Sequence, residues 1–133
     1  LMRHGGHTKA ETVLKGFLRT EWDSRVVDVF GRCRGSDVVR QLMLAESWLT
    51  RRDRDPALLL ALGRLSLQNQ LWAKAKEYFV ASVNAEPNAA AYAELARLCG
   101  SFGEWQKAAS YASLAVRHGV GELPKLPQPT AKA

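Results

Sequence analysis

The sequence has few of the residues that usually mark a catalytic, metal-binding or disulfide-bonded protein. Its 133 residues include two cysteines, Cys33 and Cys99, and three histidines. The two cysteines are too few for a disulfide framework and lack the spacing of a metal knuckle. Both lie in apolar helical patterns, so we expect buried, reduced thiols. Because the sequence also lacks a Gly-x-Gly-x-x-Gly fingerprint and a clustered set of acid, base and nucleophile, we expect no enzyme activity and no cofactor.

Long apolar runs and dense blocks of one charge are absent as well. No window holds enough consecutive apolar residues to span a bilayer, and no secretory signal is present. The formal net charge is +6, yet the richest basic cluster, Arg51, Arg52 and Arg54, is diluted by Asp53 and Asp55. The charge balance therefore permits acidic partners and does not predict nucleic-acid binding.

The sequence does contain an internal repeat. Leu62–Leu65 and Leu95–Leu98 share a Leu-small-Arg-Leu pattern 33 positions apart, and Phe30–Cys33 adds a third copy. In the same register Trp72 matches Trp105. A period of this length, with small residues at fixed helix positions, resembles the tetratricopeptide repeat, a pair of antiparallel helices. Because one hairpin cannot bury its own apolar stripe, we predict an all-α, right-handed superhelical stack of hairpins.

The predicted array covers residues 1–120, and a Pro-rich flexible tail follows at 121–133. Within the array we expect a partial hairpin at 1–20 and repeats at about 23–53, 56–87 and 89–119. Apolar periodicity and capping residues predict about seven helices, which begin near Thr8, Asp23, Ser36, Asp55, Leu71, Asn88 and Glu104. Gly100 and Gly119 are expected to end the last two helices.

Six segments go beyond a generic repeat. In chain order they are Glu21–Asp23, Phe30–Gly31, Ala45–Leu49, Leu58–Leu65, Leu71–Ala75 and Ala81–Ser82. They resemble the C-terminal part of the HemY family of proteobacterial protoheme IX biogenesis proteins. The resemblance spans roughly Ala10 to Val116, and Ala73 stands where the family pattern has Gly.

This resemblance implies a parent protein that is anchored in the bacterial inner membrane by two N-terminal transmembrane helices. It places this domain on the cytoplasmic side and implies a role in the late steps of haem synthesis. The chain begins within a helix-like pattern at Leu1, which also favours a longer parent. We expect a non-catalytic scaffold for haem-biosynthesis enzymes. Two alternatives stay open: a carrier that binds haem or a porphyrin directly, and a general tetratricopeptide adaptor unrelated to haem.

Arg32, Arg64 and Arg97 occupy the same position in three successive repeat copies. In tetratricopeptide stacks this position, on the first helix of each hairpin, faces the concave groove. Packed helices lie about 10 Å apart, so we expect the three guanidinium groups to line one wall and bind an acidic partner segment or an anionic ligand. The alternative is that they pair within the fold, with Asp28, Glu94 or a neighbouring helix end.

Other side chains could bind a ligand, but their patterns favour structural roles. We expect Trp72 and Trp105, which begin the second helices of two hairpins, to pack between hairpins, and Trp22 to close a helix end. Side chains able to ligate haem iron are present without an attachment motif: His4, His7, Cys33, Met43, Cys99 and His118.

Overall fold

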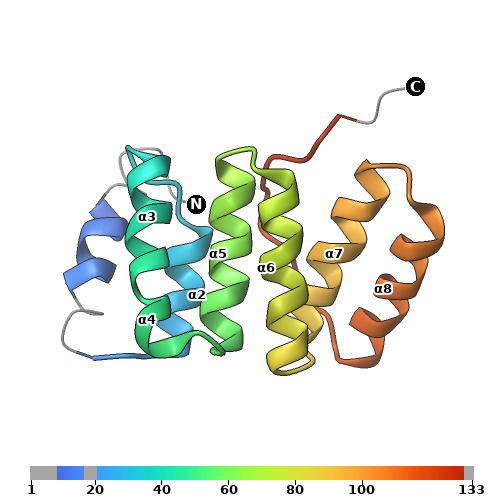
Figure 1. Ribbon diagram of the computed structural model, residues 1–133, viewed down its shortest axis with the longest axis horizontal. Coiled ribbons are helices and arrows are strands. Elements are labelled where there is room, and N and C mark those ends of the chain that lie inside the picture. The colour runs from blue at the N-terminus through green and yellow to red at the C-terminus, as the bar shows by residue number, and fades with distance from the viewer. Residues whose placement is uncertain (1–8, 17–20, 131–133) are drawn as a thin grey trace.

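The computed structural model describes residues 9–16 and 21–130, and all regular secondary structure in these residues is helical (Figure 1). A helical segment at residues 9–16 is followed by α2 (Ser24–Arg32), α3 (Val38–Ser47), α4 (Leu49–Arg52), α5 (Pro56–Gln68), α6 (Trp72–Ala85), α7 (Ala89–Ser101) and α8 (Trp105–Arg117). Figure 1 shows the helices side by side, with α5 and α6, and α7 and α8, as antiparallel hairpins. The predicted all-α class is confirmed. No helix in the described residues is long and apolar enough to cross a bilayer.

Side-chain caps fix the starts of four helices. Asp23, Asp37, Asp55 and Asn88 each accept a hydrogen bond from a backbone N–H in the first turn of the helix that follows. Each cap satisfies a donor that has no partner within its own helix. Pro56 occupies the first turn of α5, where its missing N–H costs no hydrogen bond. The predicted starts of α2, α3, α5 and α7 are confirmed.

Two predicted helix boundaries are wrong. The helix predicted to begin near Ser36 is interrupted at Trp48, whose N–H donates to the carbonyl of Ala45 and tightens the last turn of α3. Gly100 does not end α7, which continues one residue further. Gly103, with φ of 79°, is the residue in the left-handed conformation after this helix. The ends of the helix predicted from Thr8, and much of the partial hairpin at 1–20, lie outside the described residues.

The central helix α5 is enclosed by its neighbours. Every residue from Leu58 to Leu67 is buried, as expected of a helix that packs on all sides. One apolar cluster joins α5 to α2 and α3, and a second joins it to α6, α7 and Leu126. The two halves of the array are therefore connected through one helix.

Two glycines allow close helix packing. A Cβ atom at Gly31 would lie 2.7 Å from the Cα atom of Ala61, so α2 approaches the backbone of α5. A Cβ atom at Gly63 would lie 2.3 Å from the ring of Phe79, so α5 approaches α6. Both residues occupy the small position of the repeat, which explains why a small residue recurs there.

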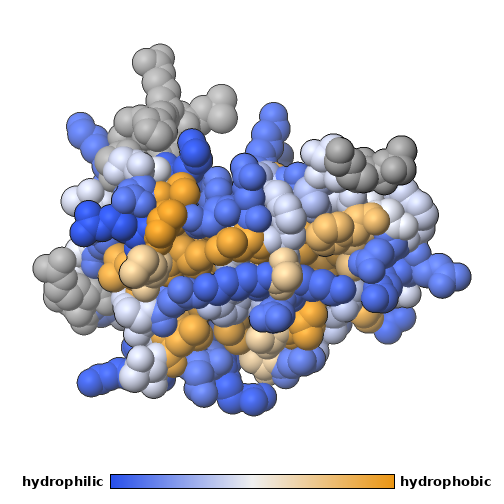
Figure 2. Space-filling view, turned by 45° about the horizontal axis from the view of Figure 1, so that its top comes forward, coloured by the Kyte–Doolittle hydropathy of each residue, from blue (hydrophilic) through white to orange (hydrophobic). Residues whose placement is uncertain are grey.

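Large apolar side chains are exposed at both ends of the array. Val13, in the helical segment at residues 9–16, is 69% exposed, and Trp105 and Val116 on α8 are each 71% exposed. Figure 2 shows apolar side chains in a band along the long axis, bordered by hydrophilic side chains. These residues are exposed because no further described helix packs on the outer side of either segment.

The segment after α8 forms no helix, but it packs against the array. Gly119, with φ of 82°, follows the end of α8 as predicted. Residues 121–130 are non-helical, and in Figure 1 this segment passes behind α6 and α7. Leu126 is 9% exposed, and the carbonyl of Pro124 accepts a hydrogen bond from Arg97. Residues 121–130 are therefore non-helical and pack against the array through Leu126, and the flexibility of this segment stays a prediction.

Candidate functional site

Arg32, Arg64 and Arg97 lie on α2, α5 and α7 and belong to one chain of ion pairs. Nε of Arg64 is 2.8 Å from Oε2 of Glu94, and its Nη1 is 2.8 Å from Oδ1 of Asp28. The second oxygen of Asp28 is 2.8 Å from Nε of Arg32, and that of Glu94 is 2.6 Å from Nη2 of Arg97. Five charges thus alternate in sign across three helices.

The centre of this chain is buried and its ends are partly exposed. The side chains of Arg64 and Glu94 are 0% exposed, whereas Arg32 is 38% and Arg97 27% exposed. Arg64 has no surface with which to contact a partner, so the prediction that it lines an open groove is wrong. It binds Asp28 and Glu94 instead, because a buried guanidinium without carboxylate partners would be strongly destabilising.

The ion-pair chain keeps an excess of positive charge. Its three arginines face two carboxylates, Asp28 and Glu94, which leaves a formal charge of +1. Nη2 of Arg64 and Nε of Arg97 are buried and have no hydrogen-bond partner within the described residues. A buried donor without an acceptor costs about 1–3 kcal/mol. These two atoms therefore favour an additional acceptor, most of all a negatively charged one.

An extended segment lies beside Arg97 and joins the apolar cluster of α5. Leu60, Arg64 and Leu67 are spaced by four and three residues, which places them on one side of α5. Leu126 belongs to the same buried cluster as Leu60 and Leu67, and a backbone carbonyl of its segment lies 2.9 Å from Nη1 of Arg97. We call the surface formed by Leu60, Arg64, Leu67 and Arg97, to which Asp28 joins Arg32, the arginine face.

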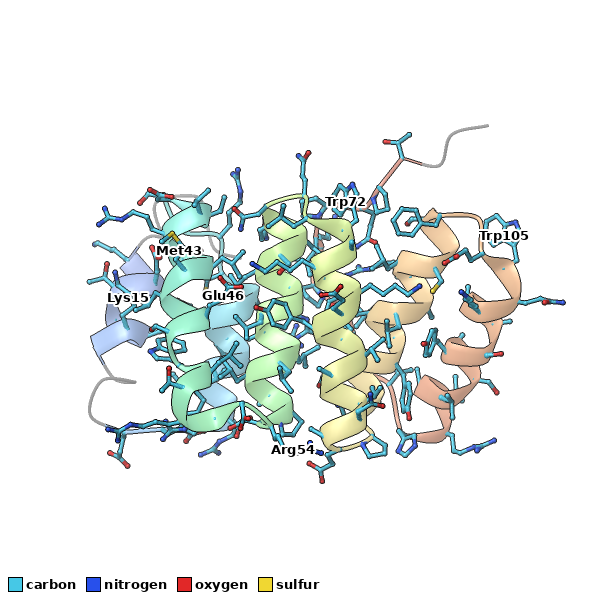
Figure 3. The ribbon with its side chains drawn as sticks, viewed as in Figure 1. Lys15, Met43, Glu46, Arg54, Trp72 and Trp105 are labelled. Atoms are coloured by element: carbon cyan, nitrogen blue, oxygen red, sulfur yellow. The ribbon has the colours of Figure 1, made fainter. Side chains whose placement is uncertain are left out.

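A second polar cluster, which sequence reasoning missed, joins α3 to α6. Oε2 of Glu46 accepts a hydrogen bond from the Tyr78 hydroxyl and lies 2.7 Å from Nζ of Lys74. Figure 3 labels Glu46 on α3. Burial raises the pKa of Glu46, but hydrogen bonds from Lys74 and Tyr78 outweigh burial, and the net pKa is lowered. Burial, together with the charge of Glu46, raises the pKa of Tyr78. The separation of Glu46 and Tyr78 by 32 residues, one repeat length, was the available signal.

The tryptophans differ in their environments. Trp72 is partly buried against the second apolar cluster, in agreement with the prediction of packing between hairpins. That prediction is wrong for Trp105, which Figure 3 shows at the end of the stack, because no described helix follows α8 to cover it. Trp22 does close a helix end: its Nε1 donates to Oδ2 of Asp55, 3.0 Å away, and so ties the starts of α2 and α5 together.

The described candidates for haem ligation do not lie together in one site. Cys33 and Cys99 are free and buried, and burial is the main cause that raises the pKa of both thiols. His118 lies against the ring of Tyr92, with 5.5 Å between ring centroids, and Met43 is 63% exposed. His4 and His7 lie outside the described residues. Among residues 9–16 and 21–130, no group of three or more His, Cys, Asp or Glu side chains could hold a metal ion.

The assignment of this site rests on its geometry and on the repeat pattern. The arginine face combines a buried ion-pair chain, two donors without acceptors and an extended segment that crosses it. Comparison of the chain with protein-family models, with curated proteins and with solved structures gives no match.

Proposed function

We propose that this chain is a non-catalytic protein-binding module whose arginine face holds an extended polypeptide segment of a partner. One observation supports this proposal above others: the arginine face already carries an extended polypeptide, residues 121–130 of the same chain. The burial of one leucine and the hydrogen bond from Arg97 to a backbone carbonyl are contacts that a segment of another protein can also make.

We propose further that the helices form a tetratricopeptide-type right-handed superhelix. Support comes from the repeat register, because the arginines recur at one position on α2, α5 and α7. The small residues Gly31 and Gly63 bring successive helices together at equivalent positions. In such a stack the first helices of the hairpins line the concave side. The arginine face would then be the concave groove, a common site of peptide binding.

The preferred partner segment is acidic. The ion-pair chain has a formal excess of one positive charge, and Nη2 of Arg64 and Nε of Arg97 lack acceptors. A carboxylate at this place would form charge-assisted hydrogen bonds. Arg32 and Arg97, at the two ends of the chain, are the members that a partner can reach. The buried Arg64 contributes indirectly, because its ion pairs hold Asp28 and Glu94 in place.

The resemblance to the HemY family makes haem-biosynthesis enzymes the proposed partners. It also supports a parent protein in the bacterial inner membrane with this module on the cytoplasmic side. Direct binding of haem or a porphyrin, and a general adaptor role, are treated as outcomes of the test rather than as second proposals. No contact of the described residues favours either of them over protein binding.

The test compares two charge-neutralising substitutions in the membrane-anchored parent protein. Arg32→Gln removes a partly exposed charge from the ion-pair chain, and Arg54→Gln removes one from an exposed position before α5 (Figure 3). Both variants are purified with their partners after mild cross-linking, and circular dichroism checks that they are folded. We expect haem-biosynthesis enzymes with the unaltered and Arg54→Gln proteins, and a several-fold loss with Arg32→Gln.

Three other results would contradict parts of this proposal. Equal recovery with both variants would mean that the ion-pair chain has no role in binding. Partners without any haem-biosynthesis enzyme would favour the general adaptor. A shift of the haem absorption band when haem is added to the purified protein, lost in neither variant, would favour the carrier.

A further inference from the structure

We propose that residues 122–129 are an internal competitor for the arginine face. The partner segment would displace them by supplying a leucine in place of Leu126 and a carboxylate for the unpaired N–H group of Arg97. This inference rests on the proposed function of the face as a surface that binds polypeptide, and it adds how that surface is regulated and what chemistry its partner has.

The segment is held by few interactions. Leu126 and Pro129 are buried, and Pro124 accepts one hydrogen bond from Arg97. Both polar side-chain atoms of Gln128 are buried and have no hydrogen-bond partner within the described residues. Buried polar atoms without partners disfavour the covered arrangement, because they would regain hydrogen bonds to water on release. The buried side chain of Gln128 therefore weakens the packing of the segment on the array.

The segment is also a poor electrostatic match for the surface that it covers. Its two charges, on Glu122 and Lys125, cancel, and both side chains are exposed. The arginine face beneath carries an excess of positive charge and two buried donors without acceptors. A segment of similar shape with a carboxylate near these donors would bind more tightly than the chain's own segment.

Release of the segment need not disturb α8. The N–H groups of His118, Gly119 and Val120 complete the hydrogen bonds at the end of that helix. Gly121 follows directly, and a Cβ atom there would meet nothing within 4 Å. The helix end is thus closed before the segment begins, and a glycine at the junction gives the backbone freedom to turn away.

The experiment uses the full chain in three forms. Leu126→Asp places a charge in the apolar cluster and should release the segment, whereas Val120→Asp makes the same change at a residue that is 39% exposed. The probe is a fluorescein-labelled peptide with the sequence of residues 121–130, and fluorescence anisotropy measures its binding. The third form is the unaltered chain. If the segment covers the face most of the time, the Leu126→Asp chain should bind the peptide at least about tenfold more tightly than the unaltered and Val120→Asp chains.

Two further peptides test the chemistry of the partner. A peptide with Lys125→Glu carries the new carboxylate next to the carbonyl that binds Arg97, so it should bind the Leu126→Asp chain several-fold more tightly. About 1 M salt should remove that gain by screening. A peptide that carries Leu126→Asp should not bind. If the Glu-containing peptide binds no better than the original, the carboxylate preference is wrong.

Three results would overturn the competitor role. One is a folded Leu126→Asp chain that binds no peptide. Another is loss of helical circular dichroism in Leu126→Asp but not in Val120→Asp, which would make the segment a permanent part of the fold. The third concerns the Arg32-dependent partner: if it binds the unaltered and Leu126→Asp chains equally, the competitor role fails while the proposed function stands.

Discussion

The guanidinium of Arg64 on α5 and the carboxylate of Glu94 on α7 form an ion pair with 2.8 Å between Nε and Oε2, and both side chains are fully buried. Asp28 on α2 binds the other side of the same guanidinium. One side chain therefore connects three helices that are far apart in the sequence, and its removal should affect all of them.

Replacement of Arg64 by Met should destabilise the protein by about 3–5 kcal/mol, because Glu94 would stay buried with one partner fewer. Arg32→Met removes a member that is 38% exposed and should cost about 1 kcal/mol or less after allowance for solvent screening. Urea unfolding followed by circular dichroism gives both values. Equal costs for the two substitutions would show that burial does not distinguish the two arginines.

Alanine substitutions at three helical glycines should have different effects. Gly31→Ala would push against the backbone of Ala61, and Gly63→Ala against the ring of Phe79, so each should cost about 1–3 kcal/mol or more. The cost should be larger at Gly31, since a backbone yields less than a ring. Gly100→Ala meets no atom closer than 3.9 Å and should stabilise the helix by up to about 1 kcal/mol. Thermal unfolding of the three variants would test this order, and a stabilising Gly31→Ala would contradict the helix packing described.

The raised pKa of Tyr78 predicts a loss of stability at alkaline pH. The folded protein holds the phenolic proton more tightly than the unfolded chain, whose pKa is near 10. The stabilisation is complete below that pKa and is lost as the pH rises above it. We expect the free energy of unfolding to fall above about pH 10, and Tyr78→Phe to reduce this slope. Tyr111→Phe serves as the control, and an unchanged slope in Tyr78→Phe would refute the assignment.

Gln41 should not tolerate a change to Glu. Its Nε2 donates to the carbonyls of Phe30 and Cys33, and its Oε1 accepts from the N–H of Gly35. A carboxylate of the same shape would face two carbonyl oxygens, so Gln41→Glu should cost about 2–4 kcal/mol at neutral pH. The cost should be smaller near pH 4, where the carboxyl group is protonated more often and can donate one hydrogen bond. The exposed Gln106→Glu is the control, and a pH-independent cost would argue against this explanation.

The sequence predicts local features of the fold better than long-range ones. Asp23, Asp55 and Asn88 act within one helical turn, so their capping role is visible in a short segment. The small residue at Gly63 was also predictable, because the repeat aligns it with Gly31. These features depend on neighbours in the chain or on the register of the repeat.

The environment of the arginines depended on residues that the repeat pattern does not contain. Glu94 has no acidic counterpart in the copies that contain Gly31 and Gly63, so its pairing with Arg64 was one of several possibilities. The burial of Leu126 was not predictable from the prolines around it, which indicate only that the segment cannot be helical. Long-range contacts between unique residues thus decided how accessible the candidate site is.

The complete burial of α5 has a consequence for how the protein unfolds. Many repeat proteins lose their terminal repeats progressively, because each repeat contacts only its neighbours. Here both apolar clusters and the ion-pair chain include α5, so the helices on both sides lose contacts when this helix is lost. The array from α2 to α7 should therefore behave as one cooperative unit, and a peptide bound across α5 and α7 would slow the unfolding of every helix in it.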